Sequence, residues 1–357
     1  MGKEITGYIG TYTELGKQTG SKGIYAFTLD EEDGGLTDIR LAAESRNPSY
    51  LTIGPSKTLF LAVNELDESK GNGLVSAFRR DPQSGNLELI NQVSSEGSNP
   101  CHVALNEKET HAVVANYTGG SIAVLPIKKE GALGKAVQVI RFSGRGPNAE
   151  RQEEPHAHFF LFNKTYDCGF AFDLGTDRLM AYTFDSGAAE PLSQAASPWL
   201  NSKPGAGPRH GVFDPTGTHW YVINELDSTV DVLRYYRATG NFEKLQNISA
   251  LPQDGSNSSA AAIKISGDGN FVYASIRGYN SITVFKRDTV RGLLSFVASV
   301  PSGGRTPRDF AVDPSGNFLL VCHQDSDSLG VFRIDRGSGK LTQVAEYTLP
   351  APVCVIF

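Results

Sequence analysis

The sequence has few cysteines, no surplus of positive charge and no long apolar run. Only 4 of its 357 residues are cysteine, and no two of these have the C-x-x-C spacing of a redox or zinc motif. The sequence has 33 basic and 39 acidic residues, and the resulting net charge of −6 argues against a surface that coats nucleic acid. An anionic ligand would therefore need a local cluster of cations.

Apolar stretches of the roughly 20 residues that span a bilayer are missing as well. The segment Met1–Thr6 contains no apolar core of a signal peptide. We therefore expect a cytoplasmic protein with neither a membrane nor a nucleic acid as partner.

Several catalytic motifs are also missing. There is no G-x-S-x-G elbow, no Gly-rich loop opening a helix for a phosphate or dinucleotide, and no H-E-x-x-H. His156 and His158 could both ligate a metal, but the sequence identifies no third ligand. We expect no metal and no cofactor.

What the sequence does contain is a repeated hairpin. In residues 207–225, two runs rich in Val, Ile, Tyr and Trp flank Asp214-Pro215-Thr216-Gly217, where Pro and Gly favour a reverse turn. The other copies of this hairpin are residues 47–65, 99–117, 154–173, 258–277 and 306–324. A second hairpin recurs between them, at 73–86, 229–245, 281–294 and 329–341. Units of four strands at a spacing of about fifty residues are typical of propeller blades.

The two ends of the chain complete the count. Tyr8–Tyr12 matches the second strand of a unit and 23–27 its third, whereas Pro352–Phe357 matches the missing first strand. The prediction is an all-β, single-domain protein over residues 1–357: a seven-bladed β-propeller with four antiparallel strands per blade. The N- and C-terminal strands share one blade, which closes the ring and removes free sheet edges.

Repeat alignment then predicts which residues share one rim of the propeller. The first strand of a blade starts at the channel mouth and the second returns to it, so both ends line the same rim. His156, Arg209, Glu225, Arg277 and Arg308 fall at these positions on consecutive blades. Arginine forks bind carboxylate or phosphate, and a carboxylate or imidazole can activate water. The cluster suggests attack on an ester-like carbonyl of an anionic substrate, with guanidinium groups stabilising the oxyanion.

Structural interpretations of the same residues stay open. Arg209 and Glu225 should be neighbours in their hairpin and could form only a salt bridge at its end. His102 and His210 could be rim or inter-blade residues with hydrogen bonds, and Arg308 could be a solvated charge at the rim. The recurrent Asn64, Asn116 and Asn224 favour a role in capping the backbone over substrate contact.

The whole chain resembles the seven-bladed propeller lactonases, which include bacterial propeller-type 6-phosphogluconolactonases and fungal carboxy-muconate cyclases. The resemblance rests on Ile9-Gly10-Thr11-Tyr12, Asn47-Pro48-Ser49-Tyr50-Leu51, Pro155-His156-Ala157-His158, Gly207-Pro208-Arg209-His210, Val222-Ile223-Asn224-Glu225-Leu226 and Pro307-Arg308-Asp309-Phe310. It implies that the family's catalytic cluster falls on His156, Arg209, Glu225 and Arg277. As substrate-binding candidates we add Glu65, His102, His158 and Arg308.

The implied function is hydrolysis of 6-phospho-glucono-1,5-lactone to 6-phosphogluconate, a step of the pentose phosphate pathway. The expected partner is a small anionic sugar lactone, and the expected state is a monomer or weak homo-oligomer. Lactone formation from a carboxylated muconate could use the same cluster. A non-catalytic propeller that binds a protein or sugar at its funnel is the alternative from another class.

Overall fold

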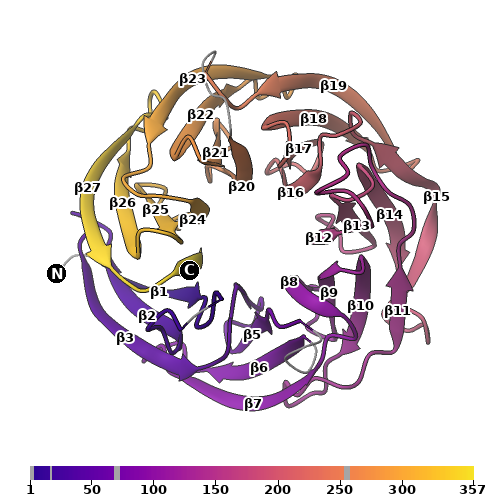
Figure 1. Ribbon diagram of the computed structural model, residues 1–357, viewed down its shortest axis with the longest axis horizontal. Helices are drawn as coiled ribbons and strands as arrows, with labels where there is room; N and C mark the ends of the chain where they lie inside the picture. The colour runs from indigo at the N-terminus through magenta and orange to yellow at the C-terminus, as the bar shows by residue number, and fades with distance from the viewer. Residues whose placement is uncertain (1–3, 17, 68–72, 253–257) are drawn as a thin grey trace. The chain divides into compact units, whose positions relative to one another are not determined.

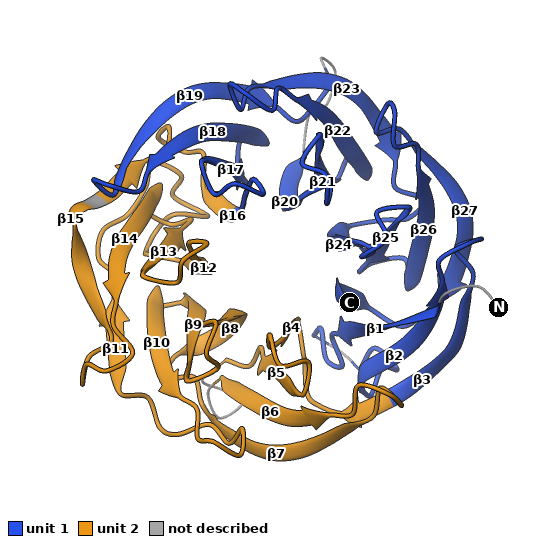
Figure 2. Ribbon diagram, turned by 180° about the vertical axis from the view of Figure 1, so that it is seen from behind, with its two compact units in different colours: residues 1–41, 210–357 blue, residues 42–209 orange. Residues whose placement is uncertain are grey.

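The computed structural model describes residues 4–16, 18–67, 73–252 and 258–357. All regular structure in these segments is β-strand, arranged as seven four-stranded antiparallel sheets. No helix in the described segments is long and apolar enough to cross a membrane. The chain forms two compact units, one of Met1–Leu41 with His210–Phe357 and the other of Ala42–Arg209 (Figure 2).

The unit of Ala42–Arg209 holds three sheets, each with its strands in chain order. They consist of β4 (Tyr50–Ile53), β5 (Leu59–Asn64), β6 (Leu74–Arg80) and β7 (Leu87–Ser94); β8 (Ser98–Leu105), β9 (His111–Thr118), β10 (Ser121–Pro126) and β11 (Gln138–Arg141); and β12 (Ala157–Phe162), β13 (Cys168–Asp173), β14 (Arg178–Phe184) and β15 (Leu192–Asn201).

The other unit holds three further sheets of the same kind. They consist of β16 (Pro208–Phe213), β17 (His219–Asn224), β18 (Thr229–Tyr236) and β19 (Asn241–Ser249); β20 (Ser259–Ile265), β21 (Phe271–Arg277), β22 (Ser281–Arg287) and β23 (Leu294–Pro301); and β24 (Pro307–Val312), β25 (Phe318–His323), β26 (Ser328–Ile334) and β27 (Leu341–Thr348). The unit boundary falls inside β16, directly after Arg209.

Both ends of the chain build the seventh sheet. Its order is β28 (Pro352–Ile356), β1 (Glu4–Thr11), β2 (Gly23–Asp30) and β3 (Leu36–Glu44), so the C-terminal strand lies beside the N-terminal one (Figure 1). Tyr8 pairs with Ile356 and Gly10 with Cys354. This confirms the predicted sheet shared by the two ends.

The repeated turns form as their sequences predict. The Asp214 carboxylate oxygen Oδ1 accepts hydrogen bonds from the backbone N–H groups of Thr218 (2.8 Å) and His219 (3.0 Å), and Gly217 takes a φ of +73°. In the equivalent turn, Asp313 Oδ1 accepts the N–H of Phe318 at 2.7 Å. Each aspartate carboxylate thus accepts backbone N–H groups that have no partner within the turn itself. These hydrogen bonds tie the two strands of the hairpin together.

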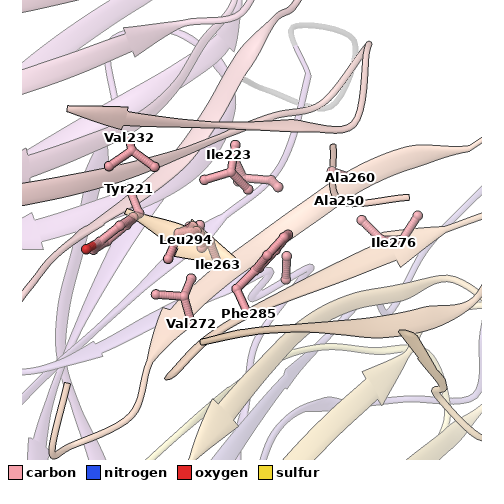
Figure 3. Packing of buried hydrophobic residues seen from close by; sticks show 12 residues of the cluster. Tyr221, Ile223, Val232, Ala250, Ala260, Ile263, Val272, Ile276, Phe285 and Leu294 are labelled. Atoms are coloured by element: carbon pink, nitrogen blue, oxygen red, sulfur yellow. The ribbon is translucent and has the colours of Figure 1, made fainter. Parts of the chain in front are cut away.

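The core lies between neighbouring sheets, and Figure 3 shows one of its clusters. Alternate residues of a strand face opposite sides of their sheet. Val272, Ala274 and Ile276 of β21 pack in one cluster with Phe285. Tyr273 of the same strand packs in the next cluster. Because these strands are buried on both faces, they are nearly continuous runs of apolar residues rather than alternating ones.

The repeats read from the sequence did not include two of the hairpins that the third and fourth strands of a sheet form. These are β10–β11 and β14–β15. The first has a long connection, residues 127–137, in place of a tight turn, and its last strand has only 4 residues. The second pairs with a register shift between Met180 and Tyr182, as the predicted second hairpins also do in their own sheets.

A buried ionic network joins two sheets at the ends of their turns. Arg287 Nη2 lies 2.6 Å from Asp214 Oδ2, and Arg287 Nε donates to the Tyr221 hydroxyl at 2.6 Å. Burial acts to raise the pKa of Asp214, but hydrogen bonds from the His219 N–H and the Thr216 hydroxyl, with the Arg287 charge, lower it overall. Burial raises the pKa of Tyr221 to about 12.

Replacement of Arg287 by alanine should destabilise the protein strongly, because it leaves the Asp214 carboxylate buried without its counter-charge. We expect a loss of about 3–5 kcal/mol in the free energy of unfolding, measured by urea denaturation. Arg291→Ala is the control, since that side chain is 71% exposed in its ion pair with Asp288 and should leave the unfolding midpoint unchanged. Equal midpoints for the two variants would contradict this account.

Candidate functional site

Most of the predicted site residues lie where the first two strands of a sheet begin and end. In several sheets the register of the first strand shifts near its start, at Pro100/His102, Ala157/Phe159, Ala260/Ile263 and Pro307/Asp309. Such a bulge takes a residue out of the ladder and redirects its side chain. His158 and Arg308 lie at two of these shifts.

Glu225 and Arg277 form an ion pair within one unit, with the glutamate buried and the arginine partly exposed. Glu225 directly follows β17 and is 3% exposed, and Arg277 ends β21. Arg277 Nη2 lies 2.8 Å from Glu225 Oε2 and also donates to the carbonyl oxygen of Ala260 at 3.1 Å. The guanidinium therefore compensates the carboxylate charge and holds it in one orientation.

Arg308 is held at its bulge by two neighbours of the same unit. Its Cζ lies 5.2 Å from the centre of the Tyr12 ring, and its Nη1 donates to Gln324 Oε1 at 3.4 Å. The residue stays partly exposed. Stacking on an aromatic ring orients a guanidinium.

His156, in the other unit, lies flat against Tyr117. The two ring centres are 4.3 Å apart with an angle of 10° between the planes, and His156 is 4% exposed. His156 Nδ1 lies 3.1 Å from the carbonyl oxygen of Tyr117. Because a carbonyl oxygen can only accept, the proton is on Nδ1, and Nε2 of the neutral ring is a proton acceptor.

Asp173 fixes the backbone beneath His156. Its Oδ1 accepts the N–H groups of His156 (2.7 Å) and Gly175 (3.0 Å), and its Oδ2 accepts the Thr176 hydroxyl at 2.5 Å. Burial raises the pKa of Asp173 despite these hydrogen bonds. Asp173 thus supports the position of His156.

The polar loop before β12 contributes residues that the sequence did not single out. Glu153 Oε1 lies 3.5 Å from His156 Nε2, and Arg151 Nη2 donates to the Tyr117 hydroxyl at 3.4 Å. Gln152 between them is fully buried and donates to the Leu174 carbonyl (2.9 Å) and to Asp177 (2.8 Å). Because Gln152 is anchored in this way, its neighbours Arg151 and Glu153 lie beside the stacked rings of Tyr117 and His156. The only sequence signal was the density of charge in 150–154.

The remaining candidates differ in their contacts. His158 meets the Tyr117 ring edge-on at 5.7 Å, so His156 and His158 contact the same tyrosine. His102 lies between Tyr50 (4.3 Å) and Phe159 (3.9 Å), and its Nδ1 accepts the N–H of Phe160. His102 thus packs between two aromatic rings, and its role in substrate binding stays a prediction.

Glu65 and Arg209 are the last two candidates, and both lie in the unit of Ala42–Arg209. Glu65 is partly exposed, and its backbone N–H donates to the Asn47 carbonyl at 3.0 Å. Arg209 lies in β16 and is 2% exposed. The recurrent asparagines make structural hydrogen bonds: Asn64 to the Arg46 carbonyl and Asn116 to the Ser95 carbonyl.

The chain matches, over residues 6–357, the family model described as Lactonase, 7-bladed beta-propeller. It belongs to this family. Each of the seven sheets is therefore one blade of the lactonase, and the predicted seven-bladed β-propeller is confirmed.

Named relatives resemble the lactonase over almost its whole length. It is 37% identical to the 6-phosphogluconolactonase of Bacillus subtilis, over 98% of this chain and 97% of the relative. A crystal structure of a 6-phosphogluconolactonase candidate from Bacteroides fragilis matches with a TM-score of 0.92 at 35% identity, over 99% of this chain and 97% of the other. The periplasmic gluconolactonase of Pseudomonas aeruginosa matches with a TM-score of 0.93 at 32% identity, over 99% of both chains.

Two groups of candidate residues can thus be described in the lactonase. One unit brings Glu225 together with Arg277, and the other brings His156 together with His158 through Tyr117. That Arg209 lies beside Glu225, and that both groups serve one site, stay predictions. Among the described residues, no three His, Cys, Asp or Glu side chains are grouped as metal ligands.

Replacement of Asp173 by asparagine should change how the stability of the lactonase depends on pH. Because the pKa of Asp173 is raised by folding, its protonation stabilises the wild type at low pH, and this contribution is lost as the pH rises through the raised pKa. Asparagine keeps an acceptor for the two N–H groups but carries no charge. Its stability relative to wild type should therefore increase as the pH rises above about 4, the ordinary pKa of an aspartate.

Urea denaturation at a series of pH values measures this difference. Asp185→Asn is the matched control, because Asp185 is an exposed aspartate that also accepts a backbone N–H, from Gly187. A difference between Asp173→Asn and wild type that stays constant with pH would contradict the assignment.

Proposed function

We propose that this lactonase hydrolyses 6-phosphoglucono-1,5-lactone to 6-phosphogluconate, in the cytoplasm and as a step of the oxidative pentose phosphate pathway. The observation that carries the proposal is the similarity to the Bacillus subtilis 6-phosphogluconolactonase over 98% of the chain. The substrate is a small sugar-phosphate lactone, and the reaction needs only water as its second reactant.

In this proposal, the site lies where the first two strands of consecutive blades open into the propeller channel. His156, Arg209, Glu225 and Arg277 lie on three consecutive blades, His156 and Arg209 where a first strand begins, and Glu225 and Arg277 where a second strand ends. A propeller presents equivalent positions of its blades to one channel. The repeat alignment therefore supports a common site for the four residues.

His156 is the proposed general base. His156 Nδ1 is hydrogen-bonded to the Tyr117 carbonyl oxygen, which leaves Nε2 as the nitrogen that accepts a proton. The Glu225 carboxylate, in contrast, is already paired with Arg277 at 2.8 Å. Stabilisation by a guanidinium weakens a carboxylate as a base. Glu225 instead orients Arg277 and offsets the charge of the arginines around the substrate.

The reaction then follows in two steps. Water attacks the lactone carbonyl carbon while His156 Nε2 takes its proton, and Arg209 and Arg277 stabilise the oxyanion. The tetrahedral intermediate collapses with cleavage of the bond between this carbon and the ring oxygen, which takes the proton from the imidazolium. The carboxylic acid formed ionises in solution to give the open-chain product.

Arg308 is the proposed phosphate ligand. It is partly exposed, and its guanidinium contacts the Tyr12 ring and Gln324. A guanidinium group held in this way can bind two phosphate oxygens at once, with little further loss of side-chain entropy.

Hydrolysis of unphosphorylated gluconolactone is the second candidate function. The printed name of the Pseudomonas aeruginosa structure, a periplasmic gluconolactonase, favours it. It would need the same base and oxyanion groups but no phosphate ligand. Muconate lactonisation and a non-catalytic binding role would give no turnover of either lactone.

A panel of the two lactones and a carboxylated muconate separates these functions. Wild type should turn over the phosphorylated lactone with the highest kcat/KM. Arg308→Ala should raise KM for that lactone about 10- to 100-fold, as expected for the loss of a charge-assisted contact, and leave the gluconolactone reaction unchanged. An equal effect on both lactones would contradict phosphate binding by Arg308.

Replacement of His156 by glutamine should lower kcat/KM about 10²- to 10⁴-fold and remove the acid limb of the pH–rate profile. Glu225→Gln should lower activity but keep that limb, because the base is still present. His111→Gln, a histidine at the far end of β9, is the control and should behave as wild type. Loss of the acid limb in Glu225→Gln alone would make Glu225 the base.

A further inference from the structure

A cavity of about 780 Å³ opens at the turn end of the first two blades of the unit Ala42–Arg209. It is lined by segments from the β4–β5 turn, the end of β6, the β8–β9 turn and the chain after β10. Tyr117, beside the proposed base, lies at the other end of β9, and a strand of this length spans roughly 20 Å. The cavity is therefore separate from the proposed active site.

Cations are concentrated around this cavity in a chain whose net charge is −6. The lining contains two carboxylates, Glu109 and Glu130, and the cations Arg79, Arg80, Lys108, Lys128 and Lys129. Glu109 Oε1 accepts the Ser56 N–H at 2.6 Å, and Arg79 is paired with Glu88 at 2.8 Å. The residues that line the cavity keep a net positive charge after these contacts are counted.

The wall of the cavity is preorganised. Arg80 is 9% exposed, its backbone N–H donates to the Thr58 carbonyl at 2.7 Å, and its Nη1 donates to the Lys57 carbonyl at 3.0 Å. Such anchoring reduces the entropy that a ligand must remove.

Leu59, Ile90 and Ile127 add apolar surface to the lining. Gly131 has a φ of +89°, and a Cβ there would lie 3.1 Å from Ile90 Cδ1, so its lack of a side chain lets the backbone approach this surface.

We propose that this cavity binds a small organic molecule with two separated anionic groups, phosphate or carboxylate, on a carbon skeleton. The cations come from three different segments, which suits two separated charges better than one compact ion. The apolar lining suits the carbon skeleton, and the volume lies within the range of small-molecule pockets. This site is independent of lactone hydrolysis.

Isothermal titration of the whole protein tests the proposal with three probes. Fructose 1,6-bisphosphate carries two phosphates, citrate carries carboxylates, and inorganic phosphate is a single compact anion. One of the two larger probes should bind with 1:1 stoichiometry, and which one binds identifies the anionic group. Inorganic phosphate should bind at least about tenfold more weakly.

The double variant Lys128→Glu/Lys129→Glu should weaken this binding at least about tenfold. The control Lys286→Glu/Lys340→Glu makes the same change in net charge at exposed lysines of the other unit and should bind as wild type. Arg308→Ala should also bind as wild type, because the cavity is not the lactone site.

Absence of binding by both larger probes at millimolar concentration would overturn the proposal. So would equal weakening in the control double variant, loss of binding in Arg308→Ala, or inorganic phosphate binding as tightly as the larger probe. Unchanged lactone hydrolysis without added anion shows that both double variants are folded.

Discussion

The antiparallel pairing of β28 with β1 is the interaction on which the rest of the structure depends. It makes one blade from the two ends of the chain and covers an edge of β1 that would otherwise present unpaired backbone groups. It also positions Tyr12. The Tyr12 N–H donates to the Ala351 carbonyl at 3.0 Å, and the Tyr12 ring packs with Val353. The same ring carries the guanidinium of Arg308. Closure of the last blade and the proposed phosphate ligand are thus coupled.

The architecture could be predicted because each blade repeats the same local chemistry. The Asp214 and Asp313 turns show this, since an Asp-Pro-x-Gly run contains the carboxylate, the fixed φ and the glycine that its hairpin uses. The β10–β11 hairpin could not be predicted in this way, because a long connection replaces the turn. The candidate site stays a prediction. Repeat position singled out Glu225 and Arg277 as candidates, but not that Arg277 reaches from its own blade to Glu225, because a repeat pattern carries no information on contacts between sheets. Glu153 lies in a loop outside the repeat.

The two groups of site residues differ in electrostatic character, which suggests a division of roles. Glu225 is buried and compensated by Arg277, an arrangement that fixes geometry and charge balance. His156 has one nitrogen committed to the Tyr117 carbonyl, its backbone fixed by Asp173 and a carboxylate 3.5 Å from its other nitrogen. That arrangement favours proton transfer at Nε2, because Glu153 would stabilise the imidazolium formed. The anionic chain thus gathers some of its cations in local clusters, at the proposed site and at the cavity beside Arg80.

A crystal structure of the protein with 6-phosphogluconate bound tests the central claim most directly. We predict one product molecule that spans both groups, with its carboxylate within hydrogen-bond distance of His156 Nε2 and the Arg277 guanidinium and its phosphate on Arg308. Product bound away from these side chains, or in contact with only one of the two groups, would contradict the account.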